Sequence, residues 1–189
     1  MKHIEKNGSF FLLILFNFCI LTSSFSQTPT EGRRAWIEGM LGDVKVRRGN
    51  SAKWLPARPK LPIKSGDAIR TFVESEATLK TNEGTIIKVS ENSTFEVSEF
   101  AGDASGSRST MKILNGQIVS DVAKLVGKKS KFEFETPTAT ASIRGTKVGF
   151  DVSSEKTDIK VYEGKVYVIP KGSKGGDEVS SNQMTTVLK

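Results

Sequence analysis

Apolar and polar residues alternate along most of the chain, from about residue 35 to its end. In the stretch Val44–Arg47, two valines occupy one face and two basic residues the other. A period of two places successive side chains on opposite faces of an extended strand. Many short segments of this kind, separated by glycine-rich turns, predict an all-β single domain of antiparallel strands and hairpins. The pattern leaves a sandwich-like and a solenoid-like arrangement open.

Short polar segments mark where the strands are expected to turn. Asn82–Gly84 and Glu91-Asn92 separate three apolar runs, and Asn115-Gly116 and Glu163-Gly164 each lie between two further runs. Asn-Gly is a strong hairpin signal, because the tight turn of a hairpin needs positive φ angles that these residues tolerate. We therefore predict turns at Asn82–Gly84 and Glu91-Asn92, and hairpins at Asn115-Gly116 and Glu163-Gly164.

Three segments depart from the alternation. Residues 118–126 carry apolar side chains at helical spacing, but their β-branched content favours a strand that runs into a loop. The glycine- and serine-rich residues 102–109 and the stretch 171–178 are predicted to be surface loops. Three prolines within residues 56–62 indicate an irregular extended connection rather than a central strand.

The beginning of the chain has a different pattern. Two lysines and a histidine precede the apolar run Phe10–Leu21, which is followed by small polar residues. These features are typical of a secretory signal peptide, and the run is shorter than the roughly 20 residues of a spanning helix. We expect a signal peptide at 1–26 that is cleaved near Ser26-Gln27, a linker at 27–34 and the domain at 35–189. The mature chain would then be periplasmic or secreted, with no transmembrane span.

Export would leave few options for catalysis. The only histidine and the only cysteine, His3 and Cys19, would leave with the signal peptide. Zinc sites built from Cys and His, and Cys-His or Ser-His-Asp catalysis, are then excluded. The spacing of the carboxylates selects no pair for acid–base work. The sequence therefore predicts no enzyme, no catalytic residue, no metal and no cofactor.

The charge of the chain allows an anionic partner without requiring one. The formal charge of +7 becomes +6 when the signal peptide takes two lysines and one glutamate with it. Such an excess suits a well-solvated surface, or contact with an anionic lipid or polymer. Residues 124–131 hold four lysines, which we interpret as a solvated loop rather than an anion site. Nucleic acid is not expected as a partner of an exported protein.

A series of short motifs resembles the FecR domain family. Its centre is Thr136-Pro137-Thr138-Ala139, followed by Ile143-Arg144-Gly145-Thr146 and an alternating strand. Further elements in the family's order are Trp54, the Gly66-Asp67 turn, and Gly164 in "VYEGKV". The residues of these motifs, which we expect to be structural, are Thr136, Pro137, Ala139, Arg144, Gly145, Thr146, Gly66, Asp67, Trp54 and Gly164.

The resemblance implies an extracytoplasmic all-β domain without enzymatic activity. In the founding members of the family, this domain follows a cytoplasmic anti-sigma segment and a membrane helix, and it receives the signal of an outer-membrane transporter. This chain resembles the stand-alone exported versions. We therefore expect a protein-binding or envelope-signalling module whose partner is an envelope or outer-membrane protein. The alternative is an envelope structural protein that binds cell-wall glycan or anionic lipid through its basic surface. Neither the ligand nor the oligomeric state follows from the sequence.

Three motif residues have roles that their chemistry suggests. Arg144 is expected to be an architectural peg, because a guanidinium carries five donors that can tie several carbonyls together. Its replacement by alanine would then destabilise the domain by about 1–3 kcal/mol. Asp67 is expected to cap its own backbone in a turn. Trp54, like Trp36, is expected to fill the core.

Overall fold

The computed structural model describes residues 33–103, 106–124 and 130–189, and within these ranges the chain forms sixteen strands and no helix. The prediction of an all-β fold is thereby confirmed. The predicted signal peptide and most of the predicted linker lie outside the described residues. In chain order the strands are β1 (Ala35–Leu41), β2 (Val44–Arg47), β3 (Trp54–Pro56), β4 (Pro62–Ile63), β5 (Ala68–Thr71), β6 (Glu76–Thr81), β7 (Ile86–Val89), β8 (Thr94–Asp103), β9 (Gly106–Asp121), β10 (Lys131–Glu135), β11 (Ala139–Ile143), β12 (Lys147–Val152), β13 (Lys156–Glu163), β14 (Lys165–Pro170), β15 (Asp177–Ser180) and β16 (Met184–Leu188).

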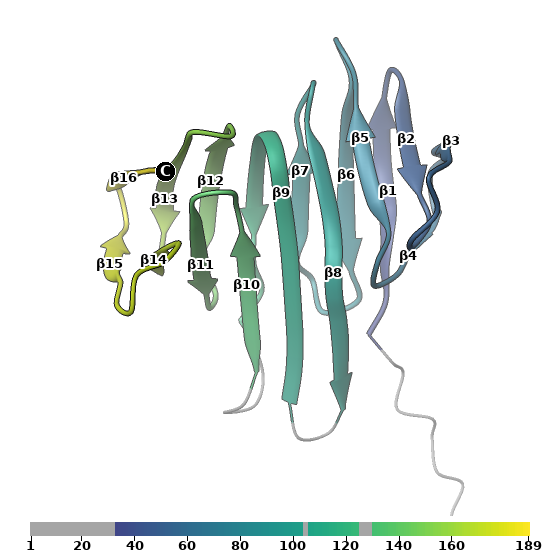
Figure 1. Ribbon diagram of the computed structural model, residues 1–189. Helices are drawn as coiled ribbons and strands as arrows, with labels where there is room; N and C mark the ends of the chain where they lie inside the picture. The colour runs from purple at the N-terminus through teal and green to yellow at the C-terminus, as the bar shows by residue number, and fades with distance from the viewer. Residues whose placement is uncertain (1–32, 104–105, 125–129) are drawn as a thin grey trace, which may run out of the picture. The chain divides into compact units, whose positions relative to one another are not determined.

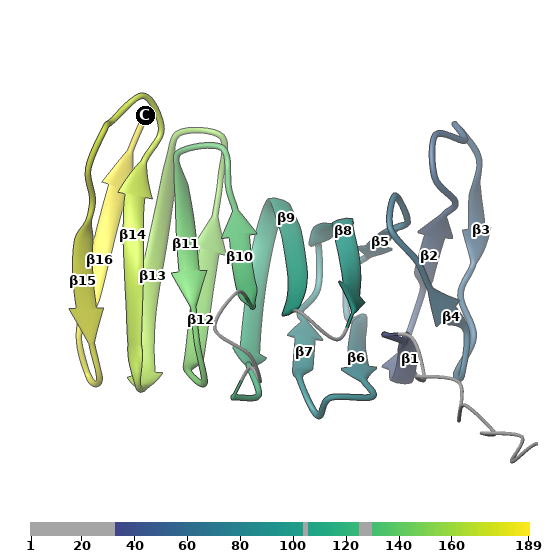
Figure 2. The same cartoon turned by 90° about the horizontal axis from the view of Figure 1, so that it is seen from below.

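Hydrogen bonding arranges the strands in two sheets that share one strand. Sheet A has the order β4-β1-β6-β7-β9-β12-β13-β16. Sheet B has the order β3-β2-β5-β8-β9-β10-β11-β14-β15. Neighbouring strands are antiparallel except β9 and β10, which are parallel. The two sheets face each other as two layers (Figures 1 and 2), which is the sandwich-like alternative.

Strand β9 passes from one sheet to the other at a glycine. Its first ten residues pair with β8 in sheet B, and the residues from Gly116 onward pair with β12 in sheet A. Gly116 has a φ of 97°, and an added Cβ would lie 2.2 Å from Oγ of Ser93. The hairpin predicted at Asn115-Gly116 is therefore wrong, because the positive φ bends a continuous strand between the two layers instead of reversing it.

The other predicted turns divide into hairpins and links between the sheets. Asn82–Gly84 joins β6 to β7, which pair with each other, so this turn is confirmed and forms a hairpin. Glu163-Gly164 joins β13 of sheet A to β14 of sheet B, and these strands pair with other neighbours, so the hairpin predicted there is wrong. The turn predicted at Glu91-Asn92 is confirmed, and it links sheet A to sheet B.

The core fills the space between the two sheets. Alternation along each strand points one side chain in two toward the facing sheet, as in β2, where Val44 and Val46 are buried. Three phenylalanines form the largest ring cluster: Phe134 lies 5.4 Å from Phe132 and 4.9 Å from Phe150 between ring centroids. One hydrophobic cluster includes side chains from both sheets and leaves no separate core in the described part of the chain.

The three irregular segments were predicted with mixed success. The prolines end β3 and begin β4, which are short strands at sheet edges, as expected. Residues 118–121 belong to a strand, as expected, while 125 and 126 lie outside the described residues. The loop predicted at 102–109 is wrong, because pairing of Gly102 with Ser107 continues the β8–β9 ladder. The loop predicted at 171–178 ends at 176, since β15 begins at Asp177.

Candidate functional site

The Thr-Pro-Thr-Ala motif connects the two sheets through buried hydroxyl groups. Thr136 and Thr138 flank the turn between β10 and β11 in sheet B, and Thr157 lies in β13 of sheet A. Oγ1 of Thr157 lies 2.8 Å from Oγ1 of Thr138 and 2.8 Å from that of Thr136. The hydroxyl of Thr138 also reaches the carbonyl of Val187 in β16, at 3.1 Å. These hydroxyls are buried, so their bonds to each other help to satisfy polar groups that water does not reach.

The same motif closes a tight turn. The backbone N–H of Thr136 donates to the carbonyl of Ala139 at 2.8 Å. The N–H of Ala139 donates to Oγ1 of Thr136 at 3.0 Å. Ala139 is fully buried and Pro137 is exposed, so the proline serves the shape of the turn and the alanine fits against the core.

Arg144 does not form the predicted hydrogen bonds to several carbonyls. Its side chain is exposed, and it donates no hydrogen bond to any described residue. The predicted tie between carbonyls is therefore wrong, because Arg144 follows the buried Ile143 and alternation directs it outward.

The residues after Arg144 carry the contacts of this segment. Thr146 donates to the carbonyl of Lys165 at 2.9 Å. Gly145 and Gly164 have φ angles of 61° and 83°. A Cβ at Gly164 would lie 3.0 Å from the carbonyl oxygen of Gly145. The β11–β12 and β13–β14 turns are therefore in direct backbone contact, which only glycine permits.

Asp67 caps the turn before β5, as expected. Its carboxylate is almost fully buried, with 4% of the residue exposed. It accepts hydrogen bonds from the backbone N–H groups of Lys64, at 3.0 Å, and Gly49, at 3.1 Å, and from the guanidinium of Arg48. Gly66, with a φ of 87°, provides the turn in which the carboxylate can reach back. The pair therefore fixes two loops to each other.

Trp54 lies on the outer face of sheet B and not in the core. The ring is partly buried, with the guanidinium of Arg70 4.4 Å and that of Arg47 5.7 Å from its centroid. Arg47 also pairs with Glu96 at 3.0 Å. The core prediction is wrong for this residue, because β3 is an edge strand whose first side chain is covered by arginines and not by the opposite sheet.

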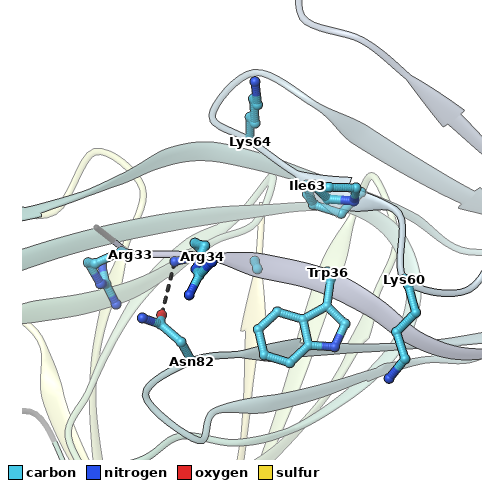
Figure 3. A pocket seen from close by; sticks show the side chains of 9 residues that line it. Arg33, Arg34, Trp36, Lys60, Ile63, Lys64 and Asn82 are labelled. Carbon is cyan, nitrogen blue, oxygen red and sulfur yellow. Dashed lines mark hydrogen bonds between the residues drawn. The ribbon is translucent and has the colours of Figure 1, made fainter. Parts of the chain in front are cut away.

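A concave site lies beside the first strand. It is a cleft of about 620 Å³ formed by β1, the turn before β4 and the β6–β7 turn. Figure 3 shows the ring of Trp36 between Arg34 and Lys60. The prediction that Trp36 fills the core is therefore also wrong. The lining residues are Arg33, Arg34, Ala35, Trp36, Lys60, Pro62, Ile63, Lys64 and Asn82.

Arg33 lines this cleft and is held in place by several contacts. Its guanidinium binds Glu83, with Nε 2.6 Å from the carboxylate, and Oγ of Ser109 at 2.6 Å. It also donates to the carbonyls of Ala101 and Arg108 and lies 4.2 Å from the ring centroid of Phe100. All of its donor nitrogens are therefore engaged. Because the sequence places Arg33 in the predicted linker, pattern alone gave no sign of this role.

The aromatic wall of the cleft is fixed by a carboxylate. Nε1 of Trp36 donates to Glu38 at 2.5 Å, and Nζ of Lys60 donates to the same oxygen at 3.0 Å. The indole hydrogen bond first, and then the lysine, lower the pKa of Glu38 below its ordinary value of 4.5. The polar groups around the ring are thus paired with each other, and they do not form a nucleophile with a base. In the described ranges, no group of three potential ligands could hold a metal ion.

The two ends of the sandwich present different edges. At one end, the edge strands β3 and β4 have three and two residues and both contain proline. At the other end, β15 and β16 have four and five residues and no proline. Figure 2 shows these pairs at opposite ends. Met184 and Leu188 of β16 are 64% and 70% exposed. Because edge strands expose unpaired backbone groups, β15 and β16 are open to a further strand.

Comparisons with known proteins place these features in a family. The profile of the family described as FecR protein matches residues 67–167. Two crystal structures of a protein from Parabacteroides distasonis ATCC 8503, assigned as an anti-sigma factor, share the fold with TM-scores of 0.53 and 0.54 and 18% identity. Each match covers 64% of this chain and 54% of that protein. No curated protein sequence matches the chain. Nowhere in the described ranges is there a helix of the length and apolarity needed to cross a membrane.

Proposed function

Since the chain belongs to the FecR protein family, we propose that it is a non-enzymatic binding module of cell-envelope signalling, which docks a protein partner on strand β16. The family is regulatory, which supports a role in relaying a signal. The observation that carries the proposal is the difference between the two ends of the sandwich. One end is closed by short proline-containing strands, and the other is open.

The backbone of β16 has a free row of hydrogen-bonding groups. In the ladder with β13, the N–H of Lys189 donates to Glu155 and the carbonyl of Gln183 accepts from Val161. Bonded positions alternate along an antiparallel ladder, so the odd-numbered residues of β16 face β13. The N–H and C=O groups of Met184, Thr186 and Leu188 therefore point away from the sheet.

The side chains of β16 would give a docked strand something to recognise. Val187 is buried between the sheets, while Met184 and Leu188 lie on the outer face of sheet A and are mostly exposed. Strand addition combines backbone hydrogen bonds with pockets for alternate side chains. The occupant that fits is an extended segment of a partner protein with apolar residues at every second position.

The place of action follows from the beginning of the chain. We infer that residues 1–26 are a signal peptide and that the mature protein acts in the periplasm or after secretion. An envelope or outer-membrane protein is then the partner within reach.

Site-specific crosslinking tests this docking mode in the cell. A photo-reactive residue is placed at Thr186 in β16 and, as a matched control, at Leu55 in the closed edge strand β3. Position 186 is expected to give one protein adduct that survives high salt, and position 55 is expected to give none. A second variant, Thr186→Pro, removes the outward N–H and is expected to abolish capture while the circular dichroism spectrum is unchanged. Equal adducts at both positions, or none at 186, would overturn the proposal.

A further inference from the structure

The exposed Arg144 belongs to a row of four cations across sheet B. Lys131 lies opposite Arg108 in the β9–β10 ladder. The β10–β11 ladder ends at the pair Phe132–Ile143, and the β11–β14 ladder ends at the pair Ile143–Val166. Arg144 is the next residue after Ile143, so it adjoins Lys131, which precedes Phe132, and Lys165, which precedes Val166. All four side chains are exposed. Neighbouring strands are about 4.8 Å apart, so the row spans about 14 Å in a straight line.

The charges of this row are only partly neutralised. Lys165 pairs with Glu178 at 2.7 Å, and Lys131 lies 3.8 Å from Glu133. Arg108 and Arg144 have no side-chain hydrogen bond or ion pair with any residue in the described ranges. Among the described residues, the row therefore presents two unpaired guanidinium groups and two lysines whose side chains are 66% and 61% exposed.

The corresponding row on the opposite sheet has a different charge pattern. At the same end of sheet A, Lys147 lies between Asp121 of β9 and Glu163 of β13. This alternation is what cross-strand pairing favours, because like charges opposite each other destabilise a sheet. The cation row on sheet B departs from that rule. Local departures that weaken a fold are expected where a surface has a function.

A fifth cation and an aromatic ring adjoin the row. The side chain of Lys124 lies against Gly145, with its Cγ 2.7 Å from the position of an added Cβ. Tyr167, two residues along β14 from Lys165, is 44% exposed and lies opposite Ser142. A tyrosine offers an apolar ring face with a hydrogen-bonding tip, which suits the face of a sugar ring.

From this geometry we infer that the row Arg108–Lys131–Arg144–Lys165 binds an acidic polysaccharide, laid across strands β9, β10, β11 and β14. The linear order of the cations matches a chain that carries carboxylates at intervals. A lipid surface fits less well, because membrane-binding faces place large apolar side chains beside their cations. In the described ranges, Tyr167 is the only exposed large hydrophobic residue within two positions of the row.

Binding to a defined polymer tests this inference. The probe is fluorescently labelled polygalacturonate, with uncharged dextran and anionic phospholipid vesicles as comparison ligands. The purified protein is expected to bind polygalacturonate saturably and not dextran, and binding is expected to weaken as salt screens the charges. The variant Arg108→Gln/Arg144→Gln is expected to weaken binding at least tenfold. The control variant Lys80→Gln/Lys88→Gln removes the same charge from the outer face of sheet A and is expected to weaken it less than twofold.

Each alternative outcome has a defined meaning. Equal losses in the two double variants would show that only net charge matters and would overturn the assignment of the row. Binding to the vesicles without binding to polygalacturonate would assign the surface to lipid, and the polysaccharide proposal would fail. Absence of saturable binding at low salt would refute it as well. Lys80 is partly buried and the other three side chains are exposed. Matching circular dichroism spectra and melting temperatures would therefore confirm that the fold is intact in both variants.

Discussion

The hydroxyl of Thr157 in sheet A lies 2.8 Å from the hydroxyl of Thr138 in sheet B. This contact crosses the core between the two layers, and Thr136 extends it at a further 2.8 Å. Three buried hydroxyls therefore connect the sheets where apolar contacts surround them. The Thr-Pro-Thr-Ala motif of the family is thus part of the packing of the sandwich.

Removal of the central hydroxyl should weaken the domain. Thr157→Val keeps the shape of the side chain but removes one hydrogen bond from each of the hydroxyls of Thr136 and Thr138, which keep their bonds to Ala139 and Val187. A typical hydrogen bond contributes about 0.5–1.5 kcal/mol net, so loss of the two should lower the free energy of unfolding by about 1–3 kcal/mol in urea titrations. The control Thr110→Val changes a partly exposed outer side chain and should shift it by less than about 0.5 kcal/mol. Equal effects of the two variants would refute a stabilising role for the three hydroxyls.

Arg144 and Gly164 should respond to substitution in opposite ways. Arg144→Ala removes an exposed side chain that bonds to no side chain or carbonyl in the described ranges, and it should change the free energy of unfolding by less than about 0.5 kcal/mol. Gly164→Ala forces a Cβ against the backbone of Gly145 at a φ of 83°. Left-handed backbone at a non-glycine residue costs about 1–3 kcal/mol. Thermal melts of both variants would measure these two changes in stability. A large loss of unfolding free energy for Arg144→Ala would support the structural role that the sequence suggested for this residue.

The strands and the core could be predicted from the sequence because each strand has one face in the core. Val44 and Val46 show this, since alternation alone identified their buried side. The sheet to which each strand belongs could not be predicted. Asn82–Gly84 and Asn115-Gly116 have the same turn chemistry, yet the first makes a hairpin and the second bends β9 between sheets. That choice depends on distant partners such as Ser93, which local pattern does not contain.

The roles of the candidate site residues could likewise be predicted only in part. The family resemblance identified Thr136 and Asp67, and the chemistry of a turn carboxylate correctly indicated the cap at Asp67. The role of Arg33 was missed, because its partners Glu83 and Ser109 lie 50 and 76 residues away. The hydroxyl bridge left one sign in the sequence, since Thr157 occupies an inward position of β13 beside the apolar Ile159 and Val161. Arg144 was misjudged because the inward or outward direction of a residue in a bend is set by its flanking strand.

The strand crossing at Gly116 gives a further prediction. Gly116→Ala should destabilise the domain by more than about 1 kcal/mol, because the φ of 97° is unfavourable for alanine and the methyl group would overlap Ser93. Hydrogen exchange should report the loss in both halves of β9, since the residue joins them. The control Gly175→Ala has no heavy atom within 4 Å of its added Cβ and should leave stability unchanged. A stable Gly116→Ala variant would show that the crossing tolerates another backbone geometry.

The Trp36–Glu38 contact makes the cleft sensitive to acid. The indole hydrogen bond and Lys60 lower the pKa of Glu38 below 4.5. The contact therefore stabilises the folded state above that pH, and its contribution is lost as the pH falls through the lowered pKa. In an NMR titration, the indole N–H resonance of Trp36 should shift with a midpoint below pH 4.5, and Glu38→Gln should abolish this step. The indole of Trp54, which stacks with Arg70 and has no carboxylate partner, is an internal control. A shift of the Trp36 signal centred above pH 4.5, or the same step in both indoles, would contradict this account of the cleft.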